Sequence, residues 1–240
     1  MIGEFRNSQM INDYVEFSGE DMTNLVNKLS NYQLINKTEF HNYQNSYDFY
    51  EKSDTYIYDL LFNNTSKDRL ISKINLFSPF LFKTVINPNY KSFLEFGGGL
   101  GLFCEIIKMM RPDMSVNYAD IKSKISDFAK WRFERRNIDV NQIIIPQNDF
   151  DFPQKYDVIF TDAVIEHLDE EQQVRYMQKL SSYVNNDGIL IPLIDLTGKE
   201  EIMPMHNDVN IVNLHNILEN SGMYCLYGKN TFSSISNKNI

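Results

Sequence analysis

Short apolar runs alternate along most of the chain with longer segments in which apolar residues recur every three or four positions. Short runs bounded by turn residues predict buried strands, and the periodic segments predict helices. The strands are expected at 93–96, 115–120, 140–145, 156–161 and 189–194. Helices are expected between and after them, at 102–110, 121–129, 169–184 and 209–218. This regular alternation favours an α/β fold with a parallel sheet.

Two further strands are expected near the C-terminus, at about 223–227 and 231–236, after a helix that Gly222 caps. With them, the favoured fold is a doubly wound, seven-stranded, mostly parallel sheet with an antiparallel end. A turn before the fifth strand is expected at Asn185–Gly188, where turn-forming residues cluster.

The first ninety residues have a helical pattern instead. Apolar residues recur at helical spacing from Met22 to Leu29, after a cap at Ser18–Asp21. A second periodic segment runs from Leu70 to Val85, and its Ser78–Pro79 pair predicts a break.

This change of pattern predicts two structural parts. They are a helical N-terminal subdomain of residues 1–88 and a sheet domain of residues 89–240. Five tyrosines lie within residues 43–62. Two roles stay open for the helical part. It is either a lid with tyrosines as amphipathic wall residues, or plain helical packing against one edge of the sheet.

A glycine-rich turn joins the first strand to the first helix of the sheet domain. The strand carries Glu95 near its end, and glycines follow at 97, 98, 99 and 101. Such a turn passes close to a ligand because no Cβ atoms intervene. In the dinucleotide fingerprint the third glycine would fall at Leu102, and a carboxylate at Glu95 would repel a pyrophosphate. The alternative is a glycine-rich turn without a ligand.

The second strand ends in Asp120, followed by Ile121. In a doubly wound sheet an acid at this place can accept hydrogen bonds from the two hydroxyls of a ribose. The other interpretation is that Asp120 caps the helix that follows.

These motifs resemble the class I S-adenosylmethionine-dependent methyltransferases, in which an acidic residue precedes Gly-x-Gly-x-Gly. A second part of the same resemblance lies at 156–159 (Tyr-Asp-Val-Ile), 164–168 (Val-Ile-Glu-His-Leu) and 187–191 (Asp-Gly-Ile-Leu-Ile). The resemblance covers about residues 90–228. It implies a Rossmann-like methyltransferase fold and S-adenosylmethionine as the cofactor, with S-adenosylhomocysteine as the product.

The resemblance also implies which residues hold the cofactor. The glycine turn would lie against its adenosyl and methionine parts, and Asp120 would contact the ribose. Asp149, with Asp151 as an alternative, would contact the adenine amino group, and Phe150 the ring. The full set expected at the cofactor is Glu95, Gly97, Gly98, Gly99, Gly101, Asp120, Ile121, Asp149, Phe150, Thr161 and Asp162.

Two histidines are the candidate catalytic bases. His167 follows the fourth strand, and His206 lies in the loop after the fifth, so both are expected at the carboxyl edge of the sheet, where ligands bind. Asp162 is a third candidate. Glu166 and the two histidines resemble the metal site of small-RNA 2′-O-methyltransferases, but Ala163 stands where that motif has its first glutamate. A metal is therefore not the expectation.

Charge and composition limit the classes of molecule that the protein is expected to bind. The 240 residues carry a formal net charge of −9, which argues against a general affinity for nucleic acid. The two cysteines, Cys104 and Cys225, are expected as small buried residues and not as a disulfide framework. No run is long enough to span a membrane, and the first residues lack a signal-peptide core, so a cytoplasmic location is expected.

The expected reaction is methyl transfer to an oxygen, or less favourably a nitrogen, of a small polar metabolite, a sugar or a surface-glycan precursor. Alternatives are a scaffold that binds the cofactor without catalysis, the metal-assisted 2′-O-methyltransferase, and a nicotinamide oxidoreductase, against which Glu95 and Leu102 count. The sequence leaves the oligomeric state open, with a homodimer among the options.

Overall fold

A computed structural model describes residues 8–146, 149–195 and 205–223. Five strands form one parallel sheet in the order β3-β2-β1-β4-β5. Their bounds are β1 (Ser92–Phe96), β2 (Ser115–Ile121), β3 (Asn141–Ile145), β4 (Tyr156–Asp162) and β5 (Val184–Leu193). The α/β class and the doubly wound, parallel arrangement are thus confirmed. Five strands replace the expected seven within the described residues, and the two expected C-terminal strands lie almost wholly outside them.

The strand order reverses between β1 and β4. Chain connections leave β1 towards β2 and β3 on one side, and β4 and β5 follow on the other. In sheets of this kind a crevice opens at the carboxyl ends of the two strands where the direction changes, and ligands bind there. The topology therefore places any ligand site beside the turn that follows β1.

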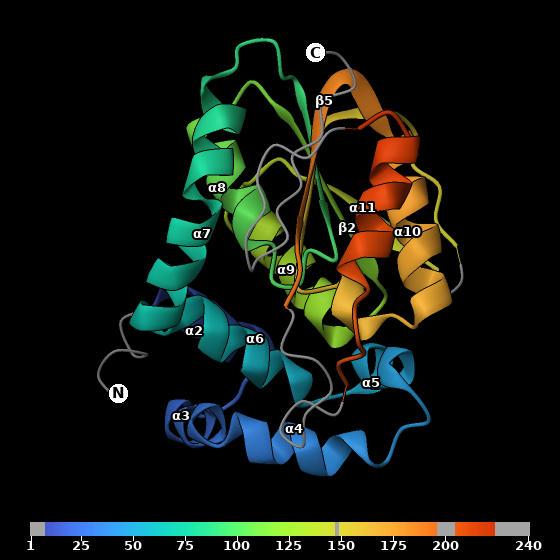
Figure 1. Ribbon diagram of the computed structural model, residues 1–240. Coiled ribbons are helices and arrows are strands. Elements are labelled where there is room, and N and C mark those ends of the chain that lie inside the picture. The colour runs from blue at the N-terminus through green and yellow to red at the C-terminus, as the bar shows by residue number, and fades with distance from the viewer. Residues whose placement is uncertain (1–7, 147–148, 196–204, 224–240) are drawn as a thin grey trace.

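Helices cover both faces of the sheet (Figure 1). One face carries α8 (Leu102–Met110) and α9 (Lys124–Arg135), with the long α7 (Lys67–Ile86) beside them. The other face carries α10 (Glu170–Ser182) and α11 (Ile211–Asn220). Successive strand residues point to opposite faces, so Phe93 packs in one apolar cluster and Leu94 in the other.

The turn predicted at Asn185–Gly188 is wrong, because the structure places these residues within β5. The pairing with β4 moves from Tyr156↔Val184 to Val158↔Ile189, so the intervening residues of β5 depart from a regular ladder. The turn-forming residues 185–188 therefore produce an irregular stretch within β5 and not a separate turn.

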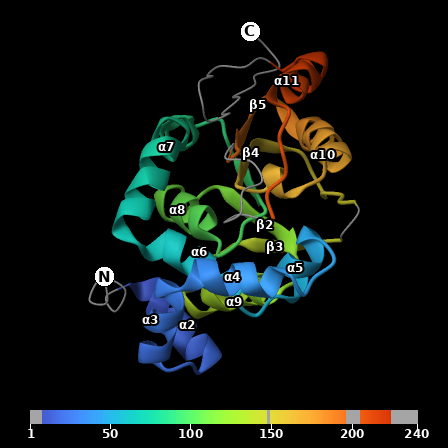
Figure 2. The same ribbon diagram turned by 60° about the horizontal axis from the view of Figure 1, so that its bottom comes forward.

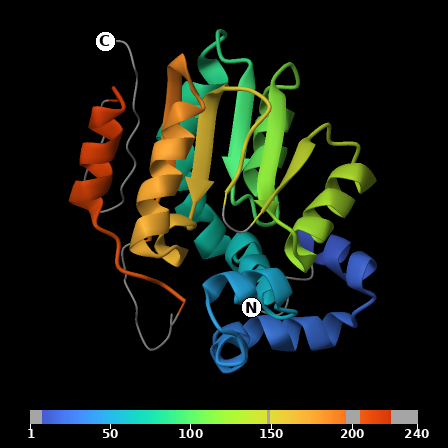
Figure 3. The ribbon, with the colours of Figure 1, turned by 90° about the vertical axis from the view of Figure 1, so that its right-hand side faces the viewer.

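The N-terminal helices lie across the carboxyl edge of the sheet, at the end to which the strand arrows point (Figures 2 and 3). They are α2 (Gln9–Ser18), α3 (Met22–Ser30), α4 (Tyr32–Phe40), α5 (Ser46–Lys52) and α6 (Tyr56–Thr65). Their apolar core continues into the sheet domain through Leu100, Ile125 and Phe128, which are all buried in the same cluster. The helices thus form one wall of the crevice. None of the described helices is long and apolar enough to cross a membrane.

The break predicted at Ser78–Pro79 is also wrong, because α7 continues through both residues. A proline within a helix removes the hydrogen bond to the carbonyl four residues earlier, here that of Asn75. The Ser78 hydroxyl donates to the carbonyl oxygen of Asn75 at 2.9 Å, so this oxygen keeps a partner.

A buried ion network attaches α2 to the sheet domain. Arg132 of α9 contacts the Asp13 carboxylate (Nε to Oδ2, 3.3 Å) and the Glu105 carboxylate (Nη2 to Oε2, 2.5 Å), and its Nη1 donates to the carbonyl oxygen of Leu100. Arg136 also contacts Asp13, at 2.8 Å. The side chains of Arg132 and Asp13 are only 3% and 6% exposed, so each charge depends on the other.

Replacing Asp13 with alanine should destabilise the protein by about 3 kcal/mol, because the buried Arg132 charge then loses one of its two carboxylate partners and Arg136 loses its close contact with Asp13. Urea unfolding followed by circular dichroism measures this. The matched control is Glu16→Ala on the same helix, whose pair with Arg135 is exposed on both sides and whose loss should cost less than about 1 kcal/mol. Equal effects of the two substitutions would refute the anchoring role of Asp13.

Candidate active site

A cavity of about 550 Å³ lies at the carboxyl edge of the sheet, between the strand ends and the N-terminal helices. The glycine turn, the ends of β2 to β4 and the start of α9 form one side of it. Residues of α4 to α7 and the loop between α4 and α5 form the other. Its lining includes Phe40, Tyr47, Tyr50, Tyr56, Leu60, Lys73, Gly97, Gly99, Asp120, Ile121, Ile145, Asp162, Ala163, Val164, His167, Leu168, Tyr176 and Asn207.

Of the four glycines in the turn, Gly97 and Gly99 line this cavity. Gly99 has a positive φ of 52°, and a Cβ placed on it would lie 3.4 Å from the nearest atom, in Leu60. At Gly98 and Gly101 a Cβ would come within 2.6 Å of the ring of Tyr118 or Phe133. These two glycines therefore permit close packing, whereas Gly99 presents bare backbone to the cavity.

Asp120 lies where it was expected, at the end of β2 and in the lining of the cavity. Its Oδ2 accepts from the Gly99 N–H at 2.7 Å and from the Tyr118 hydroxyl at 3.2 Å, and its Oδ1 accepts from the N–H of Ile121 at 2.7 Å. Burial raises the pKa of Asp120 to about 6. The alternative role as a helix cap is wrong, because the side chain of Ser123 caps α9.

Glu95 lies beneath the turn and is not part of the cavity lining. Its Oε2 accepts from the N–H of Cys104 at 2.8 Å, in the first turn of α8. Burial raises the pKa of Glu95 to about 7, and the hydrogen bond from Cys104 opposes this shift. The carboxyl group therefore fixes the start of α8 behind the glycines. Cys104 is buried beside it, as the sequence predicts.

Asp162 ends β4 and lines the cavity, whereas the neighbouring Thr161 points into the core and is fully buried. An ion pair joins Asp162 to Lys73 of α7, with 2.9 Å between Nζ and Oδ2. Lys73 was not among the residues predicted from the sequence. The signal was its place on the apolar stripe of α7, three residues after Leu70 and four before Phe77.

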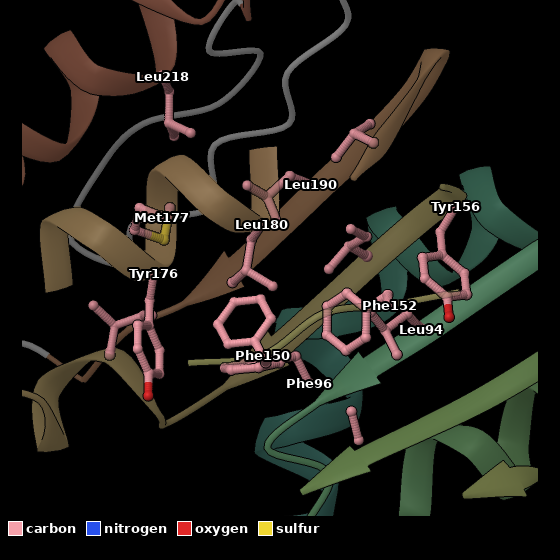
Figure 4. Packing of buried hydrophobic residues seen from close by; sticks show 14 of the residues in the cluster. Leu94, Phe96, Phe150, Phe152, Tyr156, Tyr176, Met177, Leu180, Leu190 and Leu218 are labelled. Atoms are coloured by element: carbon pink, nitrogen blue, oxygen red, sulfur yellow. The ribbon is translucent and has the colours of Figure 1, made fainter. Parts of the chain in front are cut away.

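Asp149 and Phe150 do not line the cavity. The ring of Phe150 is buried between the sheet and α10, close to Phe96, Phe152 and Tyr176 (Figure 4). The Asp149 carboxylate is exposed and pairs with Lys179. Asp151, the alternative, pairs with Lys179 as well and is more exposed still.

His167 lines the cavity and is hydrogen-bonded to a tyrosine from the helical part. The Tyr50 hydroxyl and Nδ1 of His167 are 2.7 Å apart. The ring of His206 packs edge-on against His167, with 4.8 Å between the centroids, and is itself buried outside the lining. Burial lowers the pKa of His167 to about 3, and the nearby His206 adds to the shift, so the imidazole is neutral at ordinary pH.

Glu166 is fully buried, and its hydrogen-bond partners are backbone N–H groups. Its Oε1 accepts from the N–H of Asp195 at 2.9 Å, and its carbonyl oxygen accepts from the N–H of Asn207 at 2.6 Å. Burial raises the pKa of Glu166 to about 8. Across the described ranges, no three His, Cys, Asp or Glu side chains converge as a metal site would require.

Three tyrosines of the N-terminal part, Tyr47, Tyr50 and Tyr56, line the cavity. The rings of Tyr50 and Tyr56 meet edge to face, with centroids 4.6 Å apart. Burial raises the pKa of both phenols well above 10, so they stay protonated and can donate hydrogen bonds. Tyr58, from the same sequence cluster, instead packs in the helical core.

Residues 94–190 match the model of a protein family described as a methyltransferase domain. A search of curated proteins found no match. Among solved structures the chain is similar to an O-methyltransferase family protein from Burkholderia thailandensis. The identity is 11%, the TM-score 0.58, and the match covers 79% of this chain and 63% of that one.

It is also similar to PigF with bound S-adenosylhomocysteine (13% identity, TM-score 0.55, 88% and 68% covered). A third similar structure is the O-methyltransferase NcsB1 from neocarzinostatin biosynthesis, in complex with S-adenosylhomocysteine and 1,4-dihydroxy-2-naphthoic acid (13% identity, TM-score 0.53, 74% and 58% covered). The chain thus spans about three fifths to two thirds of the length of these structures. These likenesses confirm the fold, and the match over residues 94–190 confirms the family resemblance in the sequence. Residues 94–190 of the chain thus match a methyltransferase domain, within a fold that the chain shares with these structures.

Proposed function

We propose that the protein transfers the methyl group of S-adenosylmethionine to a hydroxyl oxygen of a small, hydroxylated molecule. The observation that carries this proposal is the cavity itself. The sheet side of it presents the bare backbone of Gly99, the Asp120 carboxylate and His167, and the helical side presents Tyr47, Tyr50 and Tyr56. An oxygen acceptor is supported by the fold likeness to O-methyltransferases.

The surroundings of the glycine turn suit a nucleoside. An ionised carboxylate has about four acceptor sites, so Asp120, which already has three donors, can still accept from one ribose hydroxyl. Ile121, Ile145 and Leu168 line the cavity and offer apolar contacts for an adenine ring. They take the role that the sequence gave to Phe150.

The helical side of the cavity suits the acceptor. Each tyrosine offers an apolar ring face and a hydroxyl tip, which fits a hydroxylated ring such as a sugar or a phenol. This keeps a small polar metabolite, a sugar or a surface-glycan precursor within the proposed substrate class. The helices that carry Tyr47, Tyr50 and Tyr56 would then act as the lid.

When bound, the cofactor supplies an electrophilic methyl group on its sulfonium. The protein aligns the attacking oxygen, and such alignment can account for about 7–11 kcal/mol of a barrier. His167 is neutral. In the tautomer whose Nδ1–H donates to the Tyr50 oxygen, Nε2 is the nitrogen that can accept the hydroxyl proton, and Tyr50 fixes the orientation of the ring. General bases add about 10²–10⁴-fold. A base with so low a pKa belongs at the lower end of that range, so alignment dominates.

Asp120→Asn should weaken the binding of S-adenosylhomocysteine about tenfold to a hundredfold, because an amide accepts fewer hydrogen bonds than a carboxylate. Wild-type affinity should fall as pH drops through about 6, where Asp120 takes up a proton, and this fall should be absent from the variant. Calorimetric titrations at pH 7.5 and 5 measure both effects. The control is Asp149→Asn, which alters an exposed carboxylate outside the cavity and should leave the affinity unchanged. Equal losses in the two variants would contradict the role of Asp120.

His167→Gln should lower kcat about a hundredfold and leave the affinity for S-adenosylmethionine unchanged, because the base acts only on the acceptor. His206→Gln, which changes a ring outside the lining, should lower kcat less. Steady-state assays with a panel of hydroxylated metabolites measure this. An unchanged kcat in His167→Gln refutes the base, and cofactor binding without turnover on any acceptor favours the scaffold.

A further inference from the structure

Lys73 lines the cavity, but the proposed methyl transfer gives it no role so far. Of the described residues that line the cavity, it is the only lysine or arginine. It comes from α7, which begins beside α6 near the carboxyl edge of the sheet (Figure 1). Its side chain is 29% exposed, and that of its partner Asp162 is 21% exposed, so the pair is open on one side.

Lys73 carries a full positive charge in this place. Burial disfavours the ammonium form, but the carboxyl groups of Asp162, Asp59 and Glu95 outweigh this effect and raise the pKa of Lys73. A partly buried ion pair stabilises a fold little compared with apolar side chains of similar volume. In the sequence Lys73 stands at helical spacing between Leu70 and Phe77, where the pattern favours an apolar residue, so the pattern does not explain a charge there.

The pair has unused bonding capacity. An ammonium group has three donors, and one of those of Lys73 is directed at Oδ2 of Asp162. Two donors remain for an anion in the cavity. The Oδ1 atom of Asp162 can in turn accept from a cation. Together the two side chains can bind a neighbouring carboxylate and ammonium, which is the pattern of an α-amino acid.

The sheet places this pair opposite the ribose candidate. β2, which ends in Asp120, and β4, which ends in Asp162, flank β1 on its two sides. Strands two apart are separated by on the order of 10 Å. A ligand lying across the glycine turn thus meets Asp120 at one end and the Lys73–Asp162 pair at the other.

We propose that Lys73 and Asp162 recognise the methionine end of the cofactor. The Lys73 ammonium binds the α-carboxylate, and the Asp162 carboxylate accepts from the α-ammonium. This assignment rests on the proposed function and extends it by a residue of the helical part, since α7 precedes the sheet. The affinity for the cofactor then depends on how α7 sits against β4.

The test compares S-adenosylhomocysteine with its decarboxylated analogue, in which hydrogen replaces the carboxylate. In calorimetric titrations the wild type should bind S-adenosylhomocysteine about tenfold to a hundredfold more tightly than the analogue. Lys73→Met should bind the two ligands with affinities within about threefold of each other. Lys73→Arg, which keeps a cation, should restore most of the preference. Lys83→Met, which removes a lysine of α7 outside the cavity, should bind as the wild type does.

Asp162→Asn supplies the reciprocal measurement. This variant should bind S-adenosylhomocysteine and an analogue that lacks the amino group with similar affinities, whereas the wild type should prefer S-adenosylhomocysteine. The assignment is overturned if the wild type does not distinguish the carboxylate. It is also overturned if Lys73→Met weakens the binding of both ligands equally, because a merely structural role of Lys73 would give that result. A wild type that binds neither ligand would refute the proposed function itself. Because the wild-type comparison needs no variant, the test holds even if Lys73→Met fails to fold.

Discussion

The hydrogen bond from the N–H of Gly99 to the Asp120 carboxylate is the interaction on which the site depends. It ties the turn after β1 to the end of the adjacent strand, and Tyr118 reinforces it by donating to the same carboxylate oxygen and to the carbonyl of Gly99. Glu95 holds the other end of the turn through the N–H of Cys104. With both ends fixed, the bare backbone of Gly99 faces the cavity before any ligand arrives.

The N-terminal helices complete the cavity and are not a loose attachment. Asp13 and Arg132 fix α2 to α9, and Leu100 of the glycine turn is buried in the core of the helices. The tyrosine-bearing segment reaches the sheet domain through Tyr50 to His167, through the Ser46 hydroxyl to the carbonyl of Met205, and through an ion pair of Asp54 with Lys124. If a lid moves, these contacts must break while the anchor of α2 holds.

Most of the sheet domain could be predicted from the sequence, because each strand is a short apolar run and each helix has apolar residues every three or four positions. The places of Asp120 and the glycines at the carboxyl edge could be predicted for the same reason, since strand ends and turns are local features. The role of Phe150 was not predictable, because its burial depends on α10, which packs over it from a distant part of the chain. Lys73 was missed because only the tertiary fold brings α7 to β4, and the sequence shows merely a polar residue on an apolar stripe.

A crystal structure with S-adenosylhomocysteine is the most direct test of the central claim, which is that the glycine turn and Asp120 hold a nucleoside. We predict a ribose hydroxyl within hydrogen-bond distance of the Asp120 carboxylate and the ligand packed over the backbone of Gly99. A ligand bound elsewhere, or a ribose that faces away from Asp120, would contradict it.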